Sequence, residues 1–121
     1  MSEQDRRCRV SLIFGGVSSE HEISCLTAGG VARALDAERF EVVGIGITAD
    51  GRWVRVPLEQ VTALDVVDGT LPRVPEGLDE AVLLRGAHGA QVATRIGDTL
   101  SDPVDIDVAF ALLHGPYGCL L

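Results

Sequence analysis

The residues IFGGVSSEHEIS, which run from Ile13 to Ser24, carry the strongest structural signal in the chain. An apolar run ends at Gly15-Gly16, two serines follow, and Glu20 precedes a second apolar segment. This order predicts a buried strand, a tight glycine corner and the start of a helix. The polar side chains at the corner have two explanations: they cap the helix in contact with solvent, or they hold a small charged ligand.

The helix after this corner is expected over about residues 20–35, because its apolar positions fit one helical face. Those positions are Ile23, Leu26, Val31, Ala34 and Leu35. Ser19 and Glu22 have the spacing of a capping box. His21 is expected on the exposed side of the first turn, and Gly29-Gly30 is expected to allow close packing against the sheet.

The remaining elements are predicted from apolar runs and alternation. A buried strand over residues 9–14 precedes the corner. A strand over 40–48 and a return strand over 52–56 form a hairpin around Asp50-Gly51. The rest of the prediction is a short helix over 57–64, a loop over 65–79, weak strands over 81–84 and 91–96, and a strongly buried strand over 107–113.

This order predicts an α/β fold with a mostly parallel sheet flanked by helices, together with a β-hairpin. Ligands bind such sheets outside the carboxyl ends of the strands. Glu20 follows one of the two most apolar strands, and His114 follows the other. We therefore expect both residues at one rim of the sheet, facing one crevice.

Length, charge and hydropathy exclude several classes of protein. The 121 residues are enough for one domain, expected over 1–121, and the 46% hydrophobic content argues against disorder. A net charge of −8, with ten arginines and no lysine, argues against nucleic-acid binding. No apolar run approaches the roughly 20 residues of a membrane helix, and no signal peptide is recognisable. We therefore expect a cytoplasmic protein without membrane contact.

The three cysteines, Cys8, Cys25 and Cys119, lack Cys-x-x-Cys spacing, which favours reduced thiols over a disulfide framework or a zinc site. Cys25 lies near a helix start, where the dipole can lower the pKa of a thiol. An inert buried thiol is the interpretation we favour. Trp53, on an alternating strand, is expected to serve packing rather than ligand stacking.

The chemistry of the first corner suits a zwitterion better than a simple anion. Gly15 and Gly16 let a ligand approach the backbone, free N–H groups at the helix start favour a carboxylate, and Glu20 favours an ammonium group. Helix capping by acidic residues is the alternative. The sequence lacks both G-x-G-x-x-G and G-K-[ST] at this corner, which argues against dinucleotide and P-loop nucleotide sites.

The second corner is the glycine-rich segment HGPYG, residues 114–118. His114 can donate a hydrogen bond to a substrate carboxylate or hold a neighbouring side chain, and it can equally bond to loop backbone. Tyr117 can form a pocket wall with a polar tip or pack within the loop.

Taken together, VSLIFGGVSSEHEIS and FALLHGPYG resemble the two signature segments of the N-terminal domain of D-alanine–D-alanine ligases. FEVVGIGITADGRWV resembles the second strand and hairpin of that domain. The resemblance implies a Rossmann-like, pre-ATP-grasp domain of an enzyme that joins two D-alanines with ATP for peptidoglycan synthesis. It implies that Glu20 contacts the ammonium of the first D-alanine, that His114 orients this substrate, and that Ser18 and Ser19 belong to the loop between the glycines and Glu20.

The resemblance has one departure. The family continues H-G-x-x-G with E-D-G, whereas this sequence continues with Cys119-Leu120-Leu121. The implied cofactors, ATP and Mg²⁺, are therefore expected to bind residues outside this chain, on ATP-grasp domains supplied in cis or in trans. D-Alanine is the implied substrate, and a homodimer is a further implied assembly.

Three functions follow from these observations. The first is the first-substrate-binding domain of a D-alanine–D-alanine ligase. The second is a non-catalytic truncated fragment or split subunit without activity of its own. The third, an unrelated α/β nucleotide-binding enzyme such as a dehydrogenase, requires a glycine fingerprint that the sequence lacks.

Overall fold

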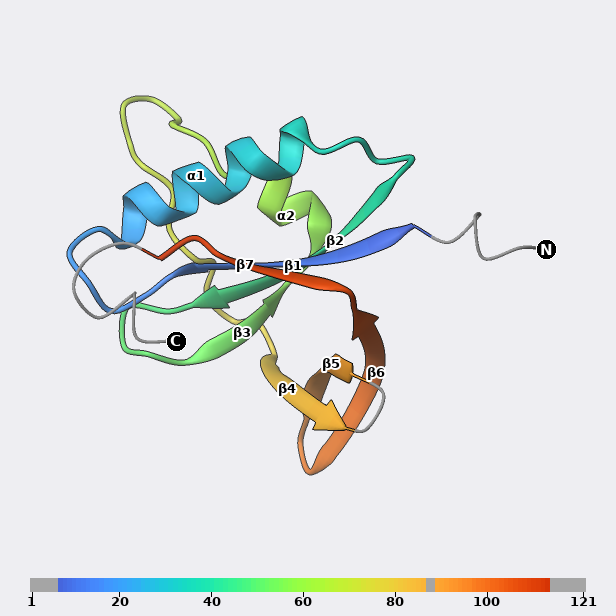
Figure 1. The fold of residues 1–121 in the computed structure, drawn as a ribbon. Coiled ribbons are helices and arrows are strands. Elements are labelled where there is room, and N and C mark those ends of the chain that lie inside the picture. Colours follow the sequence, from blue (N-terminus) through green and yellow to red (C-terminus); the bar gives the residue numbers. More distant parts are fainter. Residues whose placement is uncertain (1–6, 87–88, 114–121) are drawn as a thin grey trace.

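The computed structural model describes residues 7–86 and 89–113 (Figure 1). Within these ranges the chain forms seven strands and two helices: β1 (Cys8–Gly15), α1 (His21–Ala34), β2 (Phe40–Ile47), β3 (Trp53–Val56), α2 (Leu58–Thr62), β4 (Glu80–Gly86), β5 (Gly89–Ile96), β6 (Thr99–Ile106) and β7 (Val108–Ala111). In this part of the chain, neither helix is long and apolar enough to cross a bilayer.

All seven strands belong to one sheet in the order β6-β5-β4-β3-β2-β1-β7. The two parallel pairings among the described strands are those of β1 with β2 and of β1 with β7, and the other pairings are antiparallel. The α/β class and the hairpin of β2 with β3 are thus confirmed, but the sheet is mixed rather than mostly parallel. The short connections between successive strands from β4 to β6 explain this, because a parallel pair needs a long crossover.

The sheet is covered on both faces, by different kinds of element (Figure 1). Helices α1 and α2 lie on one face, over a core built around Leu12, Phe14 and Val56. Strands β4 to β6 fold back under the other face, where β6 contacts β1 and a second core surrounds Ile13, Val43 and Ile45. This cover on both faces explains why the middle of β1 is buried at every residue.

Helix α1 forms within a residue of the expected bounds, but the expected buried face is wrong. Its buried positions carry small or polar residues: His21, Ser24, Cys25, Ala28, Gly29 and Ala32. Ile23 is instead exposed. Small side chains let the helix axis approach its neighbours closely, so the buried stripe has little hydrophobic signal. Gly29 contacts Leu64, beyond α2, rather than the sheet.

The predicted capping box is also wrong. The residue before α1 is Glu20, and no side chain caps the helix. The Glu20 N–H donates instead to Oγ of Ser18 at 3.0 Å, which fixes the turn that precedes the helix. Ser19 is exposed and takes no part in this hydrogen bond.

Two strands differ from expectation. The strand at 107–113 forms as β7 but is exposed along its length, because it lies at the edge of the sheet in the described part of the chain. β6 was not predicted at all, since Asp102 and Pro103 interrupt its apolar pattern. Proline is tolerated there because β6 forms the other edge of the described sheet and its pairing with β5 shifts register at this point, between the pairs Val92–Val104 and Thr94–Ser101.

Candidate functional site

The first corner is built by the end of β1 and the start of α1. Gly15 and Gly16 have φ values of +93° and +103°, which favour glycine. A Cβ at Gly15 would lie 2.4 Å from the carbonyl oxygen of Ile47, so this glycine is needed for packing against β2. At Gly16 the nearest described atom to such a Cβ is the Leu113 side chain at 3.7 Å. Gly16 therefore faces the more open side of the corner.

Glu20 stands at the start of α1 with an exposed side chain. Among the described residues its carboxylate has no hydrogen bond or ion pair, whereas its carbonyl accepts a bond from the Ser24 N–H. The first N–H groups of α1 have no acceptor within the helix and lie in the same turn. The turn thus offers a free carboxylate beside the positive end of a helix dipole.

The expected meeting of the two corners is supported as far as Leu113. Because β7 runs parallel to β1, its carboxyl end lies beside Gly15 and Gly16. The Leu112 N–H donates to the carbonyl of Ile13 at 2.7 Å. His114 and Tyr117 themselves lie outside the described residues, so their expected roles stay predictions.

Ser24 ties the first corner to the end of the β7 segment, and the sequence alone did not identify it. Its side chain is fully buried, and Oγ accepts the Gly15 N–H at 2.9 Å while donating to the carbonyl of Leu112. One hydroxyl therefore bridges the end of β1 and the strand that leads to residue 114. One signal in the sequence was available. Ser24 lies three residues after His21 and one before Cys25, and this spacing places all three on one face of the helix.

His21 was expected to be exposed, and this is wrong. Its side chain is 6% exposed and lies between the corner and residue 74. Nδ1 and the Gly16 carbonyl are 2.8 Å apart, and the Val74 N–H donates to Nε2 at 3.2 Å. The imidazole is buried because both ring nitrogens find backbone partners, which removes the cost of taking them out of water.

A polar cleft of about 340 Å³ opens beside this histidine. Three segments line it: the first corner, the turn between β2 and β3, and the loop before β4. Its charged residues are Asp50, Arg52, Arg73 and Glu76. The Thr48 hydroxyl donates to the Asp50 carboxylate and is the main cause that lowers the pKa of this exposed group. The cleft therefore places both positively and negatively charged side chains next to the first corner.

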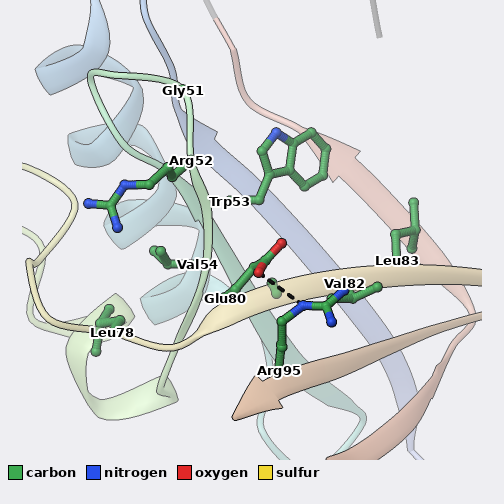
Figure 2. A pocket seen from close by; sticks show the side chains of 10 residues that line it. Gly51, Arg52, Trp53, Val54, Leu78, Glu80, Val82, Leu83 and Arg95 are labelled. Atoms are coloured by element: carbon green, nitrogen blue, oxygen red, sulfur yellow. Dashed lines mark ion pairs between the residues drawn. The ribbon is translucent and has the colours of Figure 1, made fainter. Parts of the chain in front are cut away.

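A second cavity, of about 550 Å³, lies where β3 and β4 diverge (Figure 2). The two strands share one residue pair, Val54 with Glu80. Trp53, at the start of β3, and Arg52, just before it, project in opposite directions, and Glu80 forms an ion pair with Arg95 at 3.1 Å (Figure 2). Trp53 packs against the core beneath the sheet, as expected from its strand.

Cys25 is a buried thiol, as expected. Burial raises its pKa from 9.0 to about 12, against a smaller lowering by the charge of Arg73. Within the described ranges, no three histidine, cysteine, aspartate or glutamate side chains gather in a way that could hold a metal ion.

The raised thiol pKa predicts how stability depends on pH. Between pH 9 and about 12 the unfolded thiol loses its proton while the folded thiol keeps it, so unfolding releases a proton and stability falls as pH rises. The limiting slope for one group is about 1.4 kcal/mol per pH unit. Urea unfolding at pH 8.5 and 10 measures it. Cys25→Ala should flatten this dependence of stability on pH, and an unchanged slope would contradict the raised pKa of the Cys25 thiol.

Comparison with known proteins gives a consistent result. The family model described as "D-ala D-ala ligase N-terminus" matches residues 9–119. The chain is 46% identical over 117 residues to the D-alanine–D-alanine ligase of Mycolicibacterium smegmatis, covering 93% of this chain and 30% of that protein. It thus spans about a third of the length of the curated relatives that it matches.

Two solved structures resemble the fold. The VanG D-Ala:D-Ser ligase from Enterococcus faecalis aligns with a TM-score of 0.64 and 25% identity, over 93% of this chain and 31% of that chain. The D-alanine–D-alanine ligase from Coxiella burnetii aligns with a TM-score of 0.68 at 22% identity, over 93% of this chain and 30% of that one. The second likeness concerns the fold alone.

Proposed function

The chain belongs to the D-alanine–D-alanine ligase N-terminal family, and on that premise we propose that it forms the first-substrate corner of an ATP-dependent ligase. The substrate is D-alanine, and the product serves peptidoglycan synthesis in the cytoplasm. Residues 1–121 constitute one pre-ATP-grasp domain in this proposal. The ATP-grasp part acts with it in cis or in trans, and a homodimer is the proposed assembly.

One observation carries the proposal: the parallel pairing of β7 with β1, which runs residues 112 and 113 alongside the glycine corner. A ligand at Glu20 is therefore close in space to a segment about 90 residues further along the chain. Ser24, which bonds to both segments, supports the same juxtaposition. His114 follows directly and is proposed to orient the first substrate, with Ser18, Ser19 and Tyr117 as further contacts.

The proposed mechanism of this domain is positional. The Glu20 carboxylate accepts hydrogen bonds from the ammonium of the first D-alanine, and charge-assisted bonds of this kind are the stronger ones. The positive end of the α1 dipole favours the substrate carboxylate nearby. Holding both charged ends fixes the direction in which the carboxylate reacts, which lowers the entropic part of the barrier.

ATP with Mg²⁺ supplies the phosphoryl group that activates the carboxylate in this proposal. The residues described here do not suit that cofactor: they include no cluster of metal-binding side chains, and the sequence has no lysine for the phosphates. We therefore assign ATP and Mg²⁺ to the ATP-grasp part and derive no step through them.

A graft tests the role of Glu20. This chain replaces the matching third of the Mycolicibacterium smegmatis ligase, and ligation is measured as a function of D-alanine concentration. Glu20→Ala should raise the KM for the first D-alanine about 10- to 100-fold, because it removes a charge-assisted bond worth about 1.5–3 kcal/mol. The KM of Glu20→Gln should fall between those of the parent graft and Glu20→Ala, since glutamine keeps a hydrogen-bond acceptor but loses the charge.

Glu59→Gln is the matched control, because Glu59 is also an exposed glutamate in the first turn of a helix, α2. It should leave ligation unchanged. If the Glu20→Ala graft retains the parent KM and kcat, Glu20 is not the ammonium partner.

A non-catalytic piece without activity of its own is the second candidate, and the exposure of β7 favours it. Val108 and Phe110 are 41% and 49% exposed, at an edge strand with one neighbour among the described strands. Apolar surface of this kind marks contact with other protein. Self-association in sedimentation and binding of a hydrophobic dye support this candidate, whereas a dye-negative monomer contradicts it.

A further inference from the structure

His21 has two bonds that together fix its protonation pattern. The carbonyl of Gly16 can only accept, so Nδ1 must carry the proton in the 2.8 Å bond to it. The N–H of Val74 can only donate, so Nε2 must be the acceptor at 3.2 Å. The ring is therefore a neutral imidazole with its proton on Nδ1, and neither nitrogen is free to contact a substrate.

These bonds join three segments of the chain. The Nδ1 bond runs from residue 21 back to residue 16 and closes the loop that contains Glu20. Two further bonds lie inside this loop, from the Glu20 N–H to Ser18 Oγ and from the His21 N–H to the Ser18 carbonyl at 3.2 Å. The free Glu20 carboxylate thus projects from a loop whose two ends are held together by the imidazole.

The Nε2 bond anchors the other side of the ring. Val74 is buried and packs so closely against β1 and β2 that a Cβ at Gly15 or Gly46 would lie 2.8 Å from its methyl groups. The histidine is consequently held by a residue that cannot move without disturbing the core. Its neighbour Arg73 lines the polar cleft, so the same bond also holds one wall of that cleft.

We propose that His21 is a positioning residue that sets the place of the Glu20 carboxylate by tying the Gly16 carbonyl to the first turn of α1. This rests on the proposed function, in which Glu20 binds the ammonium of the first D-alanine. The Nδ1 donor provides the positioning, and the Nε2 acceptor anchors the ring to Val74. The two ring nitrogens therefore have separable effects.

Two substitutions separate these effects. In His21→Asn the side-chain amide can place an N–H donor near the position of Nδ1 but reaches no further. In His21→Gln the side-chain oxygen can replace Nε2 as the acceptor for Val74 but leaves the Gly16 carbonyl without its donor. A residue that mattered only through bulk packing would respond to both changes in the same way.

The first measurement uses the 121-residue chain without ligand. Amide hydrogen exchange should accelerate at Val74 in His21→Asn by about fivefold or more, the equivalent of losing a bond of about 1 kcal/mol. In His21→Gln the exchange at Val74 should stay near that of the parent, while the amide resonances of residues 16–20 shift. Equal exchange at Val74 in all three proteins, with unshifted loop resonances, overturns the proposal.

The second measurement uses the ligase graft. His21→Gln should raise the KM for the first D-alanine about tenfold with little change in kcat, whereas His21→Asn should stay within about twofold of the parent. Equal KM values for both variants overturn the positioning role. A raised KM in His21→Gln together with a parental KM in Glu20→Ala also overturns the proposal, because it rejects Glu20 as the residue that His21 positions. If the parent graft is inactive, the proposed function fails and the ligand-free measurement still decides the role of His21.

Discussion

Gly29→Ala is expected to destabilise the fold by about 3 kcal/mol or more, while Gly30→Ala is expected to stabilise it by up to about 1 kcal/mol. The two glycines are adjacent in α1, so helix propensity affects them in the same way. Their surroundings differ. A Cβ at Gly29 would lie 2.0 Å from the carbonyl oxygen of Leu64, whereas outside the adjacent turns of α1 no described atom lies within 4 Å of such a Cβ at Gly30.

The contact at Gly29 cannot be relieved by rotating a side chain, because the obstructing atom belongs to the backbone. The same carbonyl also accepts a hydrogen bond from Arg33 at 2.9 Å, so moving it breaks a second interaction between α1 and the segment after α2. Relief therefore requires separation of the two segments, which opens a space in the core. The expected loss of about 3 kcal/mol or more is a large fraction of the free energy of unfolding of a whole domain, which is about 5–15 kcal/mol.

Urea unfolding monitored by far-ultraviolet circular dichroism measures both changes. The midpoint should fall for Gly29→Ala and rise for Gly30→Ala, with similar slopes for both proteins. Shifts of the same sign and size in the two variants would show that helix propensity, and not the Leu64 contact, determines the effect.

Ser24→Ala is expected to cost about 2–4 kcal/mol, because it leaves one buried and one part-buried backbone group without a partner, and a fully buried group alone costs about 1–3 kcal/mol. Those groups are the Gly15 N–H and the Leu112 carbonyl. Since one lies at the end of β1 and the other directly after β7, the variant should also loosen the end of β7. Hydrogen exchange at residues 108–113 should accelerate more than exchange in β4 and β5.

Ser11→Ala provides the matched control. Ser11 is equally buried, but its hydroxyl has no hydrogen-bond partner among the described residues. Its removal should be neutral or stabilising by about 1 kcal/mol, because a buried hydroxyl without a partner carries a desolvation cost. Thermal unfolding of both variants tests the pair. A larger loss of stability for Ser11→Ala than for Ser24→Ala would show that the Ser24 hydroxyl does not bridge Gly15 and Leu112 as described.

Local signals in the sequence predicted the parts of the fold that depend on local chemistry. The glycine corner, the helix after it and the β2–β3 hairpin formed within a few residues of expectation, because Gly15-Gly16 and Asp50-Gly51 specify turns directly. The position of Glu20 at the helix start was also expected. The chain direction of β7 followed from the α/β pattern, which placed the end of this strand beside the first corner.

The remaining features depend on packing between distant segments, which a local pattern does not encode. Ile23 was assigned to the core because it is large and apolar, but close contact selected small residues instead. His21 is polar by composition and buried only because Gly16 and Val74 supply backbone partners. The strand around Pro103 was hidden by its composition, and it forms because an edge tolerates it.

The parallel pairing around β1 has a consequence for biosynthesis. Strand β1, which begins at Cys8, borders a strand that starts at Val108, and the Arg9 N–H donates to a carboxylate oxygen of Asp107, 98 positions downstream. During translation the pairing that completes the glycine corner must therefore wait until residues 108–113 have emerged from the ribosome. Contacts of such long sequence separation slow folding, so we expect this pairing to form after the local contacts of α1 and of the β2–β3 hairpin.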